Sequence, residues 1–261
     1  MRFAYGTIGW HGELEETFGA IADLGFEGVE MFDLLDRMEH GEEVGRMLKE
    51  AGLVLSAAYF GGSFVQEDAF ARELADFEQT ARHVAKLGGG FVILGGGRRR
   101  RDREVEDTRR LMQNLDKLGR AAQRAGIQLG LHPHHGTLLS SPQEIDAAMA
   151  ATDPEVVKFA PDIAHLARCG GDPLDLLRRH LDRVVYVHLK DLGDVASDEF
   201  VELGLGKMPI LDFFRILNER GYNGWATVEL DASEDPVHSA RVNAKFVREE
   251  LGGTLRPRRP S

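Results

Sequence analysis

Four short segments in the second half of the chain bring histidine together with carboxylate residues. They are His132-Pro-His-His-Gly-Thr137, Asp162-Ile-Ala-His165, His188-Leu-Lys-Asp191 and Glu229-Leu-Asp231. Imidazole nitrogens and carboxylate oxygens are ligands for Mn²⁺, Co²⁺, Fe²⁺ and Zn²⁺. A structural zinc site built on thiolates is excluded, because Cys169 is the only cysteine. The segments therefore predict a centre for one divalent metal ion.

The ligands follow from where each segment begins. Each segment begins where a short apolar run ends, and such a run is typical of a strand. The first polar residue of each segment would therefore lie at the carboxyl end of that strand. Asp162, His188 and Glu229 are the expected metal ligands, with His132 as the fourth. His134 stays an alternative to His132, because side chains two positions apart in a strand point to the same side. Two carboxylates and two neutral histidines would balance a divalent ion, which keeps the ion a good Lewis acid.

The elements that must position these residues alternate between short apolar runs and longer helical patterns. The expected strands span Arg2–Thr7, Gly28–Phe32, Val54–Tyr59, Phe91–Leu94, Gln128–His132, Val156–Asp162, Val184–His188 and Trp225–Leu230. The expected helices span Leu14–Leu24, Glu42–Ala51, Asp68–Leu87, Val105–Ala125, Pro142–Ala151, Pro173–His180, Ile210–Arg220 and Pro236–Leu251. Eight strand–helix units in about 250 residues predict an α/β fold, the (β/α)₈ TIM barrel, whose active site lies at the carboxyl ends of its strands.

Glycines support the expected ends of the helices. Gly25, Gly52, Gly126 and Gly221 each follow a helical pattern and precede a strand, which is typical of a left-handed C-cap. No Gly-x-Gly-x-x-Gly follows the first strand, so a dinucleotide site there is not favoured. We expect a single barrel domain over residues 1–254 and a disordered basic tail over residues 255–261.

Composition limits the partners of the protein. The 261 residues are 43% hydrophobic and 29% charged, as in an ordinary globular protein. The formal net charge of −11 disfavours a nucleic-acid partner, because such a chain repels phosphate backbones. No apolar run reaches the roughly 18 residues of a membrane span, and the first residues do not read as a signal peptide. Together with the single cysteine, these features predict a cytoplasmic protein with a small-molecule substrate. A homo-oligomer is compatible with the same features.

The motifs between His132 and Glu229 resemble those of the sugar isomerase/epimerase superfamily, which has a xylose-isomerase-like TIM barrel. The motifs are Asp162-Ile-Ala-His165, His188-Leu-Lys-Asp191, Gly204-Leu-Gly206 and the late Glu229. Within that superfamily, His132-Pro-His-His-Gly-Thr137 resembles the myo-inosose (2-keto-myo-inositol) dehydratase branch. The resemblance implies carbohydrate metabolism and one divalent ion, with Mn or Co favoured over Zn or Fe.

The same resemblance implies an enzyme that acts on a small keto-polyol or keto-sugar. The metal would chelate the substrate carbonyl and a neighbouring hydroxyl, so that a base removes the α-proton and leaves a metal-stabilised enediolate. The candidate bases are Glu229, His134 and His165. The candidate substrate contacts are Glu30, His165 and Lys190. Lys190 is also a candidate catalytic group that steadies the enolate; its alternative is an ion pair with Asp191.

The enediolate can react in two ways, and both stay open. Loss of a β-hydroxyl is dehydration, whereas reprotonation elsewhere is isomerisation or epimerisation. Sugar epimerases usually carry a glutamate at the end of the fifth strand, where this chain has His132, and this difference favours inosose-dehydratase-like water elimination. A sugar or sugar-phosphate isomerase/epimerase is the alternative. Remote alternatives are an abasic-site endonuclease, which needs three zinc ions and a basic face, and a non-catalytic sugar-binding barrel.

Further residues near strand ends are candidates for the walls of the pocket. Trp10 and His11 follow the first strand, and Tyr59 and Phe60 end the third. A run of arginines over residues 98–101 follows three glycines and predicts a flexible loop, with phosphate binding as the alternative.

Overall fold

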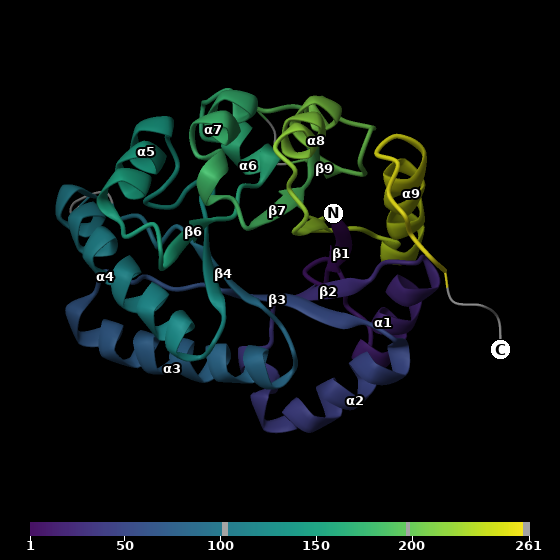
Figure 1. Ribbon diagram of the computed structural model, residues 1–261, viewed down its shortest axis with the longest axis horizontal. Helices are drawn as coiled ribbons and strands as arrows, with labels where there is room; N and C mark the ends of the chain where they lie inside the picture. The colour runs from purple at the N-terminus through teal and green to yellow at the C-terminus, as the bar shows by residue number, and fades with distance from the viewer. Residues whose placement is uncertain (101–103, 197–198, 258–261) are drawn as a thin grey trace.

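The computed structural model describes residues 1–100, 104–196 and 199–257, in which eight parallel strands form a nearly closed barrel (Figure 1). The barrel strands are β1 (Arg2–Gly6), β2 (Gly28–Met31), β3 (Val54–Phe60), β4 (Phe91–Gly95), β5 (Gln128–His132), β6 (Val157–Phe159), β7 (Tyr186–Leu189) and β10 (Trp225–Val228). Their order in the sheet is β6-β5-β4-β3-β2-β1-β10-β7. Isolated parallel bridges, Phe159 with Val184 and Asp162 with His188, join the two outermost strands. The expected TIM barrel is confirmed.

Helices surround the barrel (Figure 1). Within the described ranges they are α1 (Leu14–Asp23), α2 (Gly41–Ala51), α3 (Glu67–Lys86), α4 (Glu104–Arg124), α5 (Pro142–Ala151), α6 (Ile163–Arg168), α7 (Pro173–Arg179), α8 (Ile210–Glu219) and α9 (Pro236–Glu249). Two 3₁₀ helices, Leu35–His40 and Leu181–Arg183, complete them. All eight expected helices are present close to their expected ends.

The sixth strand is shorter than expected, and an unpredicted helix follows it. β6 ends at Phe159 instead of Asp162. Pro161 has no N–H to donate to a neighbouring strand. The Asp162 carboxylate then accepts hydrogen bonds from the N–H groups of Ala164 and His165, and so caps the first turn of α6. The strand that we expected over residues 156–162 is therefore shorter, and a helix that we did not expect begins directly after Asp162.

A second unpredicted element is a small hairpin after β7. It pairs β8 (Asp191–Leu192) with β9 (Phe200–Val201) in antiparallel register. The Phe200 ring lies 4.7 Å from the Lys190 ammonium, so the hairpin covers residues that leave the end of β7. The strands are too short for an alternation of apolar and polar residues to predict them.

The interior of the barrel is filled by unequal side chains. Ala4, Ala57 and Ala160 leave room for the large rings of Tyr186 and Trp225, and all five are buried in one cluster. Alternate residues of a strand point to the same side. Continuing this alternation to the carboxyl ends of the strands brings a polar layer into the mouth. The layer contains Glu30, Tyr59, His132, Asp162, His188 and Glu229.

The end of the described chain packs against the barrel. Leu255 is buried, and the Arg256 N–H donates to the Gly25 carbonyl, so ordered chain extends past the boundary that we expected at residue 254. Residues 258–261 of the expected tail lie outside the described residues. Of the helices in the described ranges, none has both the length and the apolar character needed to cross a membrane.

Candidate metal centre and active site

Three of the expected metal ligands meet at the carboxyl ends of neighbouring strands. Asp162, His188 and Glu229 offer ligand atoms that all lie within 4.8 Å of one another. His132 forms a second group of the same tightness with Asp162 and His165. Asp162 belongs to both groups, so the four expected ligands converge around its carboxylate. His165 belongs to this second group, whereas we expected it as a base or a substrate contact.

Asp162 uses its two oxygens differently. Oδ1 accepts from the N–H groups of Ala164 at 2.8 Å and His165 at 3.0 Å. Oδ2 is buried and has no hydrogen-bond partner, and the Lys190 ammonium lies 3.7 Å away. A buried carboxylate oxygen without a partner is costly, so a bound cation would stabilise it.

Only one of the two ring nitrogens of His188 has hydrogen-bonding partners. Its Nε2 lies 2.8 Å from Glu30 Oε2 and 3.4 Å from Glu229 Oε2. Burial lowers the pKa of His188, but Glu30 and Glu229 raise it more, to about 9. Nδ1 is buried and has no hydrogen-bond partner, so it is the nitrogen at which a metal ion could replace a proton.

The hydrogen bond of His132 leaves its other nitrogen for a metal. Nδ1 lies 3.3 Å from the Ala160 carbonyl oxygen, which can only accept. Nδ1 therefore carries the proton, and Nε2 keeps its lone pair. Burial and the neighbouring His188 lower the pKa of His132 well below its usual value, which favours the neutral form that binds metals.

Lys190 pairs with carboxylates other than the one beside it in sequence. Its ammonium donates to Glu229 Oε1 at 2.7 Å and to Asp231 Oδ1 at 2.6 Å. Burial lowers the pKa of Lys190, but these carboxylates and Asp162 raise it above the usual value, so Lys190 stays charged. The side chain is 1% exposed and is buried beneath Glu229 and Asp231, so the alternative pair with Asp191 does not form.

Asp191 instead organises the turn that follows the hairpin. Its Oδ1 accepts from the N–H groups of Leu192 and Met208, and its Oδ2 accepts from those of Gly204 and Gly206. Gly204 has a φ of +84°, and a Cβ on Gly206 would collide with the Asp191 carboxylate. The His-x-Lys-Asp and Gly-x-Gly motifs are thus two halves of one structure.

The chemistry of the donor set fits a divalent cation. Glu30, Asp162, Glu229 and Asp231 gather around Lys190 and His188, so carboxylates outnumber the cations among these groups. Among the fully buried polar atoms of this set, Asp162 Oδ2 and His188 Nδ1 have no hydrogen-bond partner. The structure therefore has a candidate His/Asp/Glu metal site.

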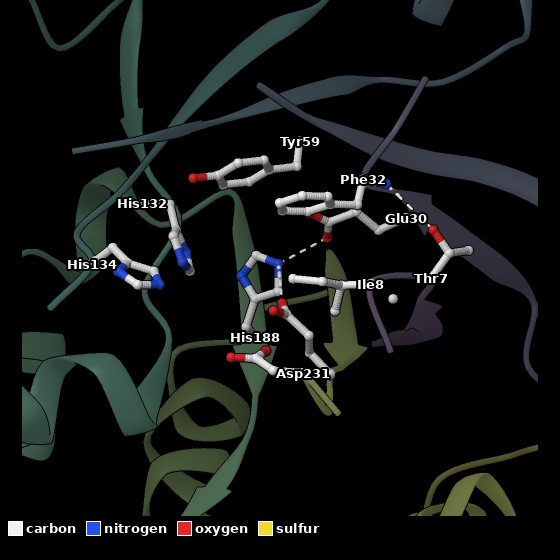
Figure 2. A pocket seen from close by; sticks show the side chains of 11 residues that line it. Thr7, Ile8, Glu30, Phe32, Tyr59, His132, His134, His188 and Asp231 are labelled. Atoms are coloured by element: carbon white, nitrogen blue, oxygen red, sulfur yellow. Dashed lines mark hydrogen bonds and ion pairs between the residues drawn. The ribbon is translucent and has the colours of Figure 1, made fainter. Parts of the chain in front are cut away.

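A cavity of about 100 Å³ opens onto the cluster (Figure 2). It is lined by Gly6, Thr7, Ile8, Glu30, Phe32, Tyr59, His132, His134, His188, Glu229 and Asp231. Tyr59 and Phe32 stack at 4.7 Å between ring centroids and form an aromatic wall. Burial raises the pKa of Tyr59 to about 12, so its hydroxyl keeps its proton. His165 and Lys190 do not belong to this lining.

The histidines after β5 differ in their access to the cavity. His134 lines the cavity, and its Nδ1 lies 2.7 Å from the His135 carbonyl oxygen. Because a carbonyl only accepts, Nδ1 carries the proton and Nε2 has a free lone pair. His165 stacks against His134 at 3.7 Å between ring centroids and is 1% exposed. His135 is exposed.

Two carboxylates beside Lys190 have opposite shifts. Burial raises the pKa of Glu229, but Lys190, His188 and His132 lower it more, to well below the usual range. Burial raises the pKa of Asp231 to about 6, in spite of Lys190. Glu229 is therefore a strongly held anion, as a metal ligand would be.

The other expected pocket residues divide by position. Tyr59 lines the cavity, but Phe60 is buried in the core against Phe77. Trp10 lies in an adjoining cavity, and His11 is exposed. The alternation along β3 separates Tyr59 from Phe60, because consecutive side chains of a strand point to opposite sides.

The arginine run is tied to carboxylates of neighbouring helices. Arg99 lies 2.6 Å from Glu144 of α5, and Arg100 lies 2.5 Å from Asp107 of α4. Arg101 lies outside the described residues. None of the described arginines of this run lines the cavity above the metal ligands.

Sequence reasoning assigned no role to several residues that line the cavity. Asp231 follows Glu229 by two positions, and Phe32 follows Glu30 by two, so strand parity was the available signal. Thr7 and Ile8 follow the first strand and carried no such signal, because backbone conformation beyond a strand end is not periodic.

Comparisons with known proteins identify the family of the chain. The family described as xylose isomerase-like TIM barrel matches residues 18–250. An inosose dehydratase of Geobacillus kaustophilus is 30% identical over an alignment of 275 positions, which covers 94% of this chain and 88% of the relative.

Two solved structures share the fold. The 3-keto-D-glucoside 4-epimerase YcjR from E. coli, in its apo form, is 21% identical with a TM-score of 0.80, covering 95% of this chain and 99% of that chain. The IolI protein with a bound zinc atom is 14% identical with a TM-score of 0.80, covering 95% and 97%. At these identities the likeness concerns the fold alone. The family match and the nearly full-length dehydratase relative confirm the expected resemblance: the chain belongs to the xylose isomerase-like TIM barrel family and is an enzyme of that superfamily.

Proposed function

We propose that this protein is a divalent-metal-dependent dehydratase of a small keto-polyol, of the inosose type. The observation that carries the proposal is the buried cluster of Asp162, His188 and Glu229, in which Asp162 Oδ2 and His188 Nδ1 have no hydrogen-bond partner. The relative named inosose dehydratase, which matches 94% of the chain, supports the substrate class.

Asp162, His188 and Glu229 would hold the metal, with His132 as the fourth ligand. The hydrogen bond from His132 Nδ1 to Ala160 leaves Nε2 as the ligand atom. Oxygen and imidazole ligands of this kind suit Mn²⁺ or Co²⁺. When bound, the ion supplies Lewis acidity that polarises the substrate carbonyl and acidifies the adjacent C–H bond.

His134 is the base that the geometry favours among the three candidates. It lines the cavity and presents a free Nε2 lone pair, because its Nδ1 proton is engaged by the His135 carbonyl. Glu229 is committed to Lys190, and His165 lies outside the lining with its Nε2 3.4 Å from the Lys190 ammonium. His165 instead packs against the His134 ring.

Water elimination then balances with one base. His134 Nε2 takes the α-proton, the C–H electron pair forms the C=C bond, and the β-C–O bond breaks as its electrons leave with the hydroxyl. The proton on His134 returns to that hydroxyl, which departs as water. Lys190 contributes to the reaction through its charge. It neutralises Glu229 and Asp231, so that these carboxylates can lie together beside the substrate.

Isomerisation or epimerisation of a keto-sugar is the second candidate. It needs proton-transfer groups at more than one position around the substrate. Asp231 also binds Lys190, but burial raises its pKa to about 6, unlike that of Glu229, so it could exchange a proton near neutral pH. It lines the cavity from the loop after β10, while His134 lines it from the loop after β5, so the cavity offers two such groups.

The metal content of the untagged protein tests the proposal first. We expect about one equivalent of Mn, Co, Fe or Zn in the wild type and its loss in Asp162→Ala. Asp172→Ala is the matched control, because Asp172 caps α7 through Oδ1 as Asp162 caps α6, but is exposed and belongs to neither group of candidate ligands. If the protein binds no metal after loading with Mn²⁺ or Co²⁺, the proposed function is wrong.

Turnover of 2-keto-myo-inositol in D₂O separates the two candidates. A dehydratase loses water and accumulates the dehydrated product. An epimerase returns substrate or an epimer that carries deuterium at the exchanged carbon. His134→Gln should abolish water loss while the metal content stays at one equivalent, and retained turnover would exclude His134 as the base.

A further inference from the structure

The Glu30 carboxylate is bound to a metal-ligand candidate on a strand that is not its neighbour. Glu30 lies on β2 and His188 on β7, with β1 and β10 between them in the sheet, yet Glu30 Oε2 and His188 Nε2 are 2.8 Å apart. Both side chains are buried, with exposed fractions of 5% for Glu30 and 1% for His188. Because a carboxylate only accepts, the His188 Nε2–H donates this bond.

This bond decides which nitrogen of His188 is left for another partner. Nε2 is occupied, and Nδ1 is buried without a hydrogen bond. Figure 2 shows one ring nitrogen of His188 on the dashed line to Glu30 and the other on the side of His132. The His132 and His188 rings lie 4.7 Å apart, so Nδ1 faces the candidate ligand His132, while Glu229 Oε2 lies 3.4 Å from Nε2.

We propose that Glu30 is a positioning residue that orients His188 for metal binding through Nδ1, and that its contact with substrate is secondary. This inference rests on the proposed function, since it assigns a role within the same metal site. A histidine ligand commonly donates its second N–H to a carboxylate, which selects the tautomer and strengthens the ligand nitrogen. Without Glu30, Nε2 would keep only the longer contact with Glu229 Oε2 at 3.4 Å, so the preference for a proton on Nε2 would be weaker.

Substrate binding by Glu30 predicts different effects. Glu30 borders the cavity, so a substrate hydroxyl could reach its second oxygen. A residue that only binds substrate would change KM and leave the affinity for metal alone untouched. A positioning residue would change metal affinity in the absence of substrate.

The test measures Co²⁺ binding to the metal-free, full-length protein in the absence of substrate, by visible absorption and chelator competition. Glu30→Ala should weaken Co²⁺ binding about 10- to 100-fold, the usual effect of removing such a partner. Glu30→Gln retains the size of the side chain and an oxygen acceptor, and should weaken binding less. Glu27→Gln is the matched control, because Glu27 lies just before the same strand, exposed and paired with Arg2.

Nitrogen-15 NMR of the Zn²⁺-loaded protein gives a second readout. His188 should carry its proton on Nε2 and bind metal through Nδ1 in the wild type, and lose this single state in Glu30→Ala. Equal Co²⁺ affinities of wild type and both Glu30 variants, within twofold, would overturn the inference while leaving the metal site intact. Absence of Co²⁺ binding to the wild type would instead refute the proposed function.

Discussion

Removal of the Asp191 carboxylate should loosen one loop at the mouth of the barrel and leave the barrel folded. Asp191 is 1% exposed, and its two oxygens accept four backbone N–H groups at 2.9 to 3.1 Å. Three of these donors belong to the turn over residues 204–208, which follows the β8–β9 hairpin. In Asp191→Ala all four N–H groups lose their acceptor.

The size of the effect follows from the number and type of bonds. A hydrogen bond to a charged acceptor contributes about 1.5–3 kcal/mol, so four would sum to roughly 6–12 kcal/mol if they were independent. They are not independent, because one opening of the loop exposes all of the donors to water. We therefore expect a loss of about 3–4 kcal/mol in the free energy of unfolding, and a Tm lower by roughly 10 °C.

Urea unfolding and amide hydrogen exchange measure the two parts of this effect. The Gly204, Gly206 and Met208 amides should lose protection in Asp191→Ala, while amides of the barrel strands stay protected. Asp194→Ala is the control within the same segment, because Asp194 is exposed and accepts from the Ala196 N–H. It should change the free energy of unfolding by less than about 1 kcal/mol.

The reasoning fails if Asp191→Ala unfolds within about 1 kcal/mol of the wild type and keeps those three amides protected. Such a result would mean that the turn is held by its own backbone conformation. A global loss of protection would also contradict it, because the loop would then be inseparable from the barrel.

Three further predictions concern the interior. Tyr186→Phe removes the hydroxyl that bonds two buried hydroxyl groups, and should lower the free energy of unfolding by about 1–2 kcal/mol without loss of bound metal; an unchanged urea midpoint would contradict it. Burial raises the pKa of Cys169 to about 12, so the thiolate is scarce at pH 8, and Ellman's reagent should react with it only after unfolding; fast reaction of the native protein would show that the site opens. Gly95→Ala would bring a Cβ onto the Tyr59 hydroxyl, so KM for the keto-polyol should rise with metal content unchanged, whereas Gly90→Ala, in open space, should leave KM unaltered.

The barrel could be predicted because its signals are local and repeated. Helical patterns that end in glycine recur before strands such as those starting at Gly28 and Val54, and each unit agrees with the next. The prediction was wrong where two local signals compete at one residue. Asp162 reads as the end of a strand, but its carboxylate caps α6, and no periodicity announces a six-residue helix.

The identity of the metal-ligand candidates could be predicted, but the distances between them and their hydrogen-bond partners could not. Strand parity placed Asp162, His188 and Glu229 at one end of the barrel, and the structure brings them within 4.8 Å. The partner of Lys190 was not predictable, because Asp231 lies 41 residues away and reaches it only through the pairing of β7 with β10. The same holds for Glu30 and His188, which are separated by 158 residues.

The sequence by itself determined the residue types at the strand ends and the number of strand–helix units, because both depend on neighbours within a few positions. Only the tertiary structure decided which nitrogen of His188 is free, which oxygen of Asp162 lacks a partner, and that His134 borders the cavity while His165 does not. Those properties depend on distances of a few ångströms between strands far apart in the chain. Closure of the barrel sets these distances, and no local pattern encodes them.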